Sequence, residues 1–135
     1  MRVRCVSTNL EGPSREILII SDYSKSLRLG TSYVVYAMSI WEGILNYLIL
    51  EREADLPFWH PAELFEVEDE MLPLETYFKY FGGKDARGVN ALWGYKEMIF
   101  DDSHYLNLIE REKKAIKVFL SRKQEIDEEN VTRRP

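Results

Sequence analysis

The stretch SYVVYAMSIWEGILNYLILE, residues 32–51, decides the fold of this chain. Two runs rich in β-branched and aromatic residues, 32–41 and 44–51, are joined by Glu42-Gly43. Because glycine readily supplies the positive φ that a tight hairpin turn needs, this spacing predicts an antiparallel β-hairpin. We therefore expect the first half of the chain to consist of short antiparallel strands.

Short apolar runs on either side of the hairpin predict further strands. Residues 2–6 begin with alternating polar and apolar side chains, and residues 16–20 form a β-branched run. Residues 58–67 predict a last short strand that is interrupted at Pro61, because proline cannot donate to a central ladder. Five short strands in about 67 residues favour a small closed barrel, since closure removes exposed sheet edges.

The second half changes to a helical period. Residues 74–81, between Pro73 and Gly82, predict a short helix, residues 82–90 predict a loop, and residues 91–100 support no assignment. From Ser103 onward, apolar residues recur at three- and four-residue intervals or multiples of them, which predicts one long amphipathic helix. The residues of this stripe are Tyr105, Leu108, Ile109, Ile116, Phe119, Leu120 and Ile126.

Size and composition describe one globular domain. The chain has 135 residues, 45% hydrophobic and 30% charged, which is enough to bury a single core. We expect an α+β domain over residues 1–135, with a β-barrel part at 1–67, a helical part packed on it at 68–130 and a frayed tail at 131–135.

Three features of the sequence indicate the cellular compartment: the length of its uncharged stretches, its N-terminus and its cysteine count. The longest uncharged stretch, residues 29–41, is well short of the roughly twenty residues that span a bilayer. The N-terminus lacks the apolar region of a secretory signal, and a single cysteine cannot form an internal disulfide. We therefore expect a cytoplasmic protein.

The charge distribution is uneven. Residues 53–78, the acidic segment, contain eight acidic residues and no Lys or Arg, whereas the rest of the chain has 15 acidic and 18 basic residues. The overall charge of -5 therefore comes from one segment, which also contains aromatic residues. Such a segment can attract a basic partner and repel polyanions. A run of this kind is more often simply a solvated face.

The first half resembles a loose group of small SH3-like barrels in uncharacterised bacterial and phage proteins. In that group, a first strand bearing Cys is followed by a Leu-x-x-Gly-x-x-Tyr-x-Val element, an aromatic strand and a closing Phe-Glu. The matching residues here are Cys5, residues 27–35 with Leu27, Gly30, Tyr33 and Val35, residues 46–49 and residues 61–66. The insertion from Thr8 to Ser26 departs from the pattern. The resemblance implies an SH3-like antiparallel β-barrel over residues 1–67.

The whole chain resembles, in size and charge, the immunity proteins that bacteria make against toxins, which are frequently nucleases with basic clefts. That resemblance implies a cytoplasmic, non-enzymatic inhibitor that covers a basic active site. No motif of an immunity protein is matched residue by residue.

Catalytic and metal sites find little support in the sequence. His60 and His104 are the only histidines and lie 44 positions apart, and no His/Cys cluster has the spacing of a zinc site. Cys5 falls in a predicted strand, where a thiol acts as a small hydrophobe. We expect no catalytic residue, no metal and no cofactor.

Two further motifs have simpler interpretations. Residues 110–113, Glu-Arg-Glu-Lys, are reminiscent of nuclease metal sites but lie in a predicted helix, where surface salt bridges are typical. Residues 82–88 are glycine-rich and basic, but they match no phosphate-binding pattern. The basic residues of the last helix are interrupted by glutamates, so we expect no binding of nucleic acid.

The sequence thus favours a protein that binds another protein and touches neither nucleic acid nor membrane. Acidic residues would steer a basic toxin domain, and aromatic residues would anchor it. The predicted partner-binding residues are Trp59, Glu63, Glu66, Glu68, Asp69, Glu70, Glu75 and Tyr77.

Two other functions stay open. The first is an SH3-like module for peptide binding or self-association, which would need an exposed strand edge or an aromatic groove. The second is an enzyme that depends on His60 or His104. The sequence leaves the oligomeric state open.

Overall fold

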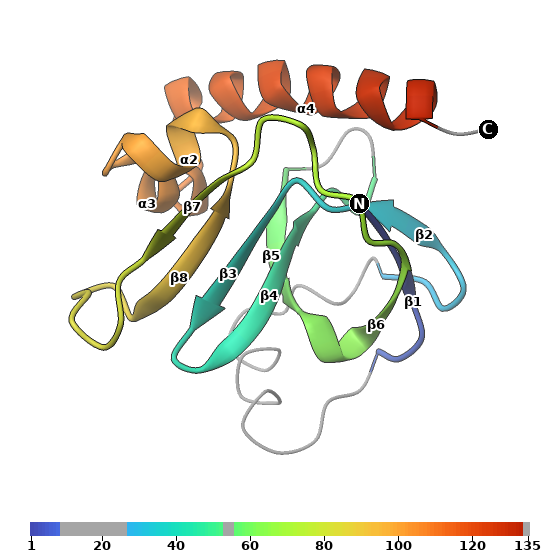
Figure 1. Cartoon of the computed structure of the whole chain (residues 1–135), viewed down its shortest axis with the longest axis horizontal. Coiled ribbons are helices and arrows are strands. Elements are labelled where there is room, and N and C mark those ends of the chain that lie inside the picture. Colours follow the sequence, from blue (N-terminus) through green and yellow to red (C-terminus); the bar gives the residue numbers. More distant parts are fainter. Residues whose placement is uncertain (9–26, 53–55, 134–135) are drawn as a thin grey trace.

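The computed structural model describes residues 1–8, 27–52 and 56–133 of the chain. These residues form an α+β fold with two antiparallel sheets and a long C-terminal helix (Figure 1). The strands are β1 (Arg2–Cys5), β2 (Ser32–Val34), β3 (Ala37–Trp41), β4 (Ile44–Ile49), β5 (Phe58–Pro61), β6 (Phe65–Asp69), β7 (Tyr77–Tyr80) and β8 (Val89–Gly94). The helices are the 3-10 turn η2 (Ala62–Leu64), α2 (Lys96–Phe100), α3 (His104–Ile109) and α4 (Lys113–Arg133).

The predicted hairpin is confirmed. β3 pairs antiparallel with β4, and Trp41 lies opposite Ile44 across the turn. Glu42 and Gly43 both have positive φ, 46° and 81°, as the favoured two-residue hairpin turn requires. The run from 32 to 41 is nevertheless two strands. β2 belongs to the three-stranded sheet β2-β1-β6, whereas β3 belongs to the five-stranded sheet β5-β4-β3-β8-β7.

The predicted break at Pro61 is also confirmed. β5 ends at Pro61 and lies at an edge of the five-stranded sheet, where proline is tolerated. After η2 the chain enters β6, which pairs with β1 in the other sheet. The described strands therefore form two separate sheets, and no closed barrel ladder is present among them. The expected strand at 16–20 lies outside the described residues.

The helix predicted for residues 74–81 is wrong. Residues 77–80 form β7, which pairs with β8 from Tyr77 opposite Gly94 to Tyr80 opposite Ala91. Pro73 and the Gly82-Gly83 pair fit a helix locally, but pairing with β8 overrides that local preference. Residues 68–130 are therefore only partly helical, since β7 and β8 lie within them.

The long helix predicted from Ser103 is two helices, α3 and α4. The helical conformation is interrupted at Arg111, because its φ of 63° is left-handed and incompatible with a continuing helix. The stripe divides accordingly: Tyr105, Leu108, Phe119 and Ile126 are buried, while Ile109 and Leu120 are exposed. The tail was also misjudged, because α4 continues to Arg133.

Two hydrophobic cores hold the layers together. The larger core packs Phe119 and Ile126 of α4 against strand residues such as Leu92, so α4 lies across the molecule above the sheets (Figure 1). The smaller core lies around Val3 and Ile49 and joins the two sheets. No helix in the described ranges is long and apolar enough to cross a membrane.

Candidate functional site

The structure spreads the predicted partner-binding residues over β5, η2, β6, β7 and the segment between β6 and β7. Glu66 and Glu68 lie on one face of β6, with their side chains exposed. Arg4 of β1 donates to Glu66 at 2.9 Å, and the Ser32 hydroxyl of β2 donates to Glu68. Part of the negative charge predicted for an interface is therefore compensated within the three-stranded sheet. Glu63 is exposed on η2, the 3-10 turn that precedes β6, and is not part of this face.

Trp59 is partly buried and packs against the larger core. Its ring lies 5.6 Å from the ring of Tyr105. Tyr77 is more accessible, but its ring contacts that of Phe100 in α2 at 5.1 Å. Of the two predicted aromatic anchors, only Tyr77 lies at the surface.

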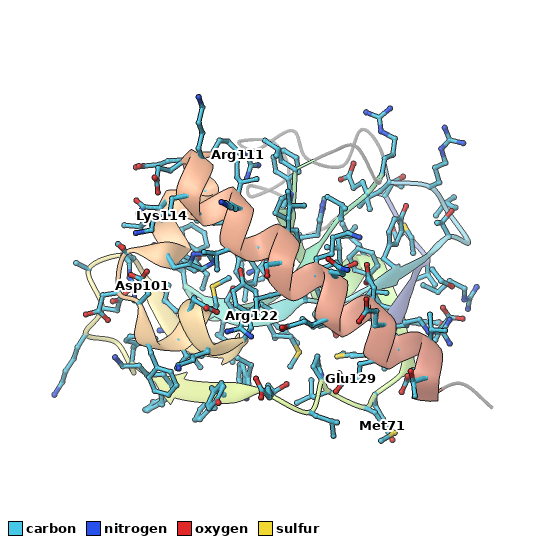
Figure 2. All side chains as sticks on the ribbon, turned by 90° about the horizontal axis from the view of Figure 1, so that it is seen from above. Met71, Asp101, Arg111, Lys114, Arg122 and Glu129 are labelled. Atoms are coloured by element: carbon cyan, nitrogen blue, oxygen red, sulfur yellow. The ribbon has the colours of Figure 1, made fainter. Side chains whose placement is uncertain are left out.

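The segment between β6 and β7, residues 70–76, forms a strap that runs beside α4 before it enters β7 (Figures 1 and 2). Three bonds fix the path of the strap. Asp69 accepts the Met71 amide at 3.0 Å, the Thr76 hydroxyl donates to the Pro73 carbonyl at 2.6 Å, and Glu129 of α4 accepts the Leu74 amide at 2.9 Å. Seen from above, Glu129 and Met71 lie together beside the C-terminal half of α4 (Figure 2).

The strap exposes apolar side chains beside acidic ones. Leu74 is 82% exposed and Met71 is 58% exposed. Glu70 and Glu75, two of the predicted partner-binding residues, are exposed at the ends of the same short segment. Exposed apolar residues in a polar surround are typical of a protein-binding surface.

A cavity of about 290 Å³ lies between the strap and α4, here called the strap cavity. Pro73, Leu74, Tyr95 and Ile126 form its apolar wall. Its polar lining consists of Glu75 from the strap and Arg122, Glu125 and Glu129 from α4. The lining thus carries three carboxylates and one guanidinium.

The guanidinium of Arg122 already donates hydrogen bonds to two carboxylates, one outside the cavity lining and one within it. It donates twice to Glu97 of α2, at 2.8 and 3.0 Å, and once to Glu125, at 3.0 Å. The bonds from Arg122 lower the pKa of Glu97, and those to Glu97 raise the pKa of Arg122. Glu97 lies outside the lining and offsets the positive charge of Arg122. The three lining carboxylates, Glu75, Glu125 and Glu129, therefore give the strap cavity a negative charge.

A second cluster of titratable groups is enclosed. Glu51 Oε1 lies 3.0 Å from His60 Nε2, and both side chains are buried. Cys5 belongs to the same smaller core with 0% exposure, and burial raises the pKa of its thiol. A thiolate is therefore disfavoured, and a substrate has no direct approach to the sulfur.

The motifs considered for catalysis have structural roles in the described residues. Arg111 donates to the carbonyls of Pro57 and Leu108, and its guanidinium lies 4.1 Å from the ring centre of Phe58. Residues 82–88 form the turn between β7 and β8. Among residues 1–8, 27–52 and 56–133, no group of three or more His, Cys, Asp or Glu side chains could hold a metal ion.

The sequence analysis singled out acidic residues of the strap, but it did not identify the α4 residues that line the other side of the strap cavity. Glu70 and Glu75 were expected at an interface, whereas Glu125, Glu129 and Arg122 were assigned only to a helix. No local signal identifies them, because their proximity to residue 75 depends on how α4 packs beside the strap. The alternation of acidic and basic residues on α4 is also found on any solvated helix face.

Comparison with known proteins assigns no family to the chain. No family model, no curated protein and no solved structure matches it. The candidate site is therefore defined by its own residues: the exposed strap, the strap cavity and the carboxylates around it.

Proposed function

We propose that the protein is a non-enzymatic inhibitor that binds a basic protein and covers its active site. The observation that carries this proposal is the strap, where exposed Leu74 and Met71 lie beside Glu70, Glu75 and the acidic strap cavity. Apolar contacts would limit dissociation, and the surrounding carboxylates would speed association and select a basic surface. An immunity protein that neutralises a bacterial toxin is the specific form expected from the sequence, and it stays a prediction.

The acidic face of β6 has a secondary role in this proposal. Glu66 and Glu68 already have partners in Arg4 and Ser32, so they contribute less to direct contacts than the strap does. Their charge still adds to the field that attracts a basic partner over about 8 Å at physiological salt. The proposed interface is therefore centred on the strap, with β6 as its rim.

The SH3-like resemblance remains part of the proposal. β1 lies between β2 and β6, and the smaller core joins this sheet to β4 through Tyr47 and Ile49. Strands that wrap around one core in this way support the expectation of a small barrel over residues 1–67. The fold by itself does not determine the function.

Charge reversal on the strap tests the proposed function. The wild-type chain, the variant Glu70→Lys/Glu75→Lys and the control Glu110→Lys are each immobilised and exposed to an extract of the source cell. Glu110 is exposed at the end of α3, outside the strap and its cavity. We expect wild type and control to retain the same basic protein, identified by mass spectrometry, and the strap variant to lose it.

Kinetics with the purified partner then examine the mechanism. The strap variant should associate more slowly than wild type at low salt, with a flatter dependence on ionic strength, because steering charges act mainly on the association rate. Equal association rates for wild type and the strap variant would place the interface elsewhere. Inhibition of the partner's own activity is the final readout.

A second function, binding of a peptide or a second copy, is favoured by β7. β7 is the last strand of the five-stranded sheet, and Phe78 and Tyr80 are 53% and 72% exposed. Phe81 donates to Asn90 of β8, so the alternation of an antiparallel ladder directs the backbone groups of Phe78 and Tyr80 away from β8. Such an edge can accept an added strand.

Light scattering after size-exclusion chromatography distinguishes the two functions. A stable homodimer that is abolished by Phe78→Lys would favour strand addition at β7. A monomer at all concentrations, with partner binding unaffected by Phe78→Lys, would favour the strap.

A further inference from the structure

We propose that the outward-facing side of α4 binds the same side of a second copy of the chain, with the two helices antiparallel. The inference goes beyond the proposed function and does not depend on it, because it uses no residue of the strap. The occupant is a second copy because the charges of this side complement those of the same side turned end for end. Such an interface is isologous, so each contact occurs twice about a two-fold axis.

α4 forms the outermost layer of the described structure. It lies above the sheets in one view and in front of them when the molecule is seen from above (Figures 1 and 2). Its inner side packs into the larger core through Ala115, Phe119 and Ile126. At about 100° per residue, a set of exposed residues lies within about 40° of one line along the opposite side. This set, here called the outer face of α4, is Lys113, Lys117, Ser121, Gln124, Glu128 and Val131.

The charges of the outer face are segregated along the helix, although acidic and basic residues alternate on α4 as a whole. Lys113 and Lys117 lie in the first half of the helix, whereas Glu128 lies in the second half. The residues between them on this face, Ser121 and Gln124, are uncharged. A two-fold axis at the level of Ser121 and Gln124 therefore brings Lys117 of each copy opposite Glu128 of the other.

Lys117 and Glu128 lack opposite charges at helical spacing within their own chain. No residue three or four positions away from either side chain has the opposite charge. Glu128 accepts one bond from the neutral amide of Gln124, at 3.3 Å. By contrast, Lys123 on another side of α4 donates to Asp127 at 2.6 Å. The usual intrahelical pairing is thus missing on the outer face, and an antiparallel second copy supplies the opposite charges.

The first turn of α4 gives a further reason for an acidic neighbour. Lys113 and Lys114 lie at the positive end of the helix dipole, which disfavours cations. Glu110 and Glu112 precede the helix and offset part of this charge, so Lys117 is the better probe of the interface. In the antiparallel dimer, the acidic half of the second helix and the negative end of its dipole lie beside this turn.

Exposed apolar side chains add contact area next to the charges. Val131 is 72% exposed on the outer face, and Leu120 is 48% exposed at its margin. In the antiparallel arrangement, Val131 lies beside the methylene stem of Lys114 of the other copy, which can cover it. Exposed ion pairs are individually weak and are screened by salt. We therefore expect a reversible dimer that forms at high protein concentration and low salt.

Sedimentation equilibrium of the full chain, up to millimolar concentration at low salt, measures this dimer. We expect wild type to dimerise, with a dissociation constant that rises at least about fivefold at high salt because the facing charges are screened. Phe78→Lys should leave the dimer intact, which separates it from strand addition at β7. A wild-type chain that stays monomeric under these conditions, or a dimer that does not respond to salt, would overturn the inference.

Charge reversal tests the antiparallel arrangement. Lys117→Glu alone and Glu128→Lys alone should each be monomeric, because each variant places like charges opposite one another twice. An equal mixture of these two variants should form a heterodimer, since every facing pair then again has opposite signs. The double variant Lys117→Glu/Glu128→Lys should dimerise as wild type does. If the mixture stays monomeric while wild type dimerises, the two residues do not face each other.

Matched controls separate this effect from net charge. Lys84→Glu and Glu42→Lys make the same changes in net charge at exposed positions in the β7–β8 and β3–β4 turns, which lie far from α4 (Figure 1). Both controls should dimerise like wild type. All variants should keep the thermal unfolding temperature of wild type, because exposed substitutions of this kind change stability little. Equal loss of the dimer in the controls and in the α4 variants would contradict the proposed interface.

Discussion

The hydroxyl of Tyr95 lies 2.6 Å from Nε2 of His104, in a buried pair that joins the end of β8 to the first turn of α3. Burial raises the pKa of Tyr95, so its hydroxyl stays protonated and can donate to the imidazole. Burial also lowers the pKa of His104, against smaller opposing effects of Asp101, Glu97 and Glu112. The pair is therefore neutral at pH 7, and its Tyr95 also lines the strap cavity.

His104 should make the stability of the protein depend on mildly acidic pH. Because its folded pKa is below the ordinary value of 6.5, the unfolded chain binds a proton more readily than the folded chain does. The stability that neutral His104 contributes is complete above pH 6.5 and is lost as the pH falls toward the lowered folded pKa. Urea unfolding at a series of pH values should show this loss.

The variant His104→Gln isolates that effect, since glutamine does not titrate. Its stability should fall less than that of wild type between pH 6.5 and pH 5, and each pKa unit of difference corresponds to about 1.4 kcal/mol. The carboxylates with lowered pKa values, Asp85, Glu97 and Asp101, lose their contributions at lower pH than His104 does. Identical pH profiles for both proteins would show that His104 does not account for the slope.

Trp59 provides a test of the distinction between core and interface. Its ring packs on Tyr105 and the larger core, so Trp59→Ala should destabilise the fold by about 3 kcal/mol. Partner affinity, corrected for the folded fraction, should be unchanged. If Trp59→Ala remains folded and loses affinity for the partner without losing stability, Trp59 is part of the interface. Calorimetry measures the stability, and a binding assay measures the affinity.

Two arginines should differ in their contributions to stability. Arg122 makes two bonds to Glu97 across α2 and α4, with both side chains mostly covered, so Arg122→Gln should cost about 1–2 kcal/mol. Arg4 makes one bond to exposed Glu66, and Arg4→Gln should cost at most about 0.5 kcal/mol. Urea denaturation of both variants checks the order, and a larger loss for Arg4→Gln would contradict it.

The fold could be predicted from sequence where local chemistry decides it. Glu42-Gly43 between β-rich runs gave the correct hairpin, and Pro61 marked the end of an edge strand. Residues 77–80 were misread because their aromatic residues fit either a short helix or a strand, and only the pairing with β8 settles the choice. Arg111, in a left-handed conformation between α3 and α4, carries no sequence signal of a helix break.

The candidate site could be predicted only in part for a similar reason. A run of acidic residues can be counted in a sequence, so Glu70 and Glu75 were found. Whether a basic residue neutralises each carboxylate depends on contacts between residues far apart in the sequence. Glu66 is an example, because its partner Arg4 lies 62 positions away. The strap cavity needs α4 to pack beside the strap, and no pattern in either segment encodes that packing.

Gly88 and Gly83 lie in the same β7–β8 connection but should respond differently to alanine. Gly88 has a φ of 86°, and a Cβ there would lie 2.9 Å from Nε1 of Trp41, which donates to the Arg87 carbonyl at 2.8 Å. Gly88→Ala therefore adds backbone strain and displaces a buried indole, at an expected cost of about 2 kcal/mol.

Gly83 is the matched control, because a Cβ there meets nothing within 4 Å and its φ is not left-handed. Gly83→Ala should change stability by no more than about 0.5 kcal/mol, and reduced freedom of the unfolded chain favours a small gain. Thermal and urea unfolding of the two variants measure the difference. If Gly88→Ala is as stable as Gly83→Ala, then the contact between Gly88 and Trp41 does not constrain the turn.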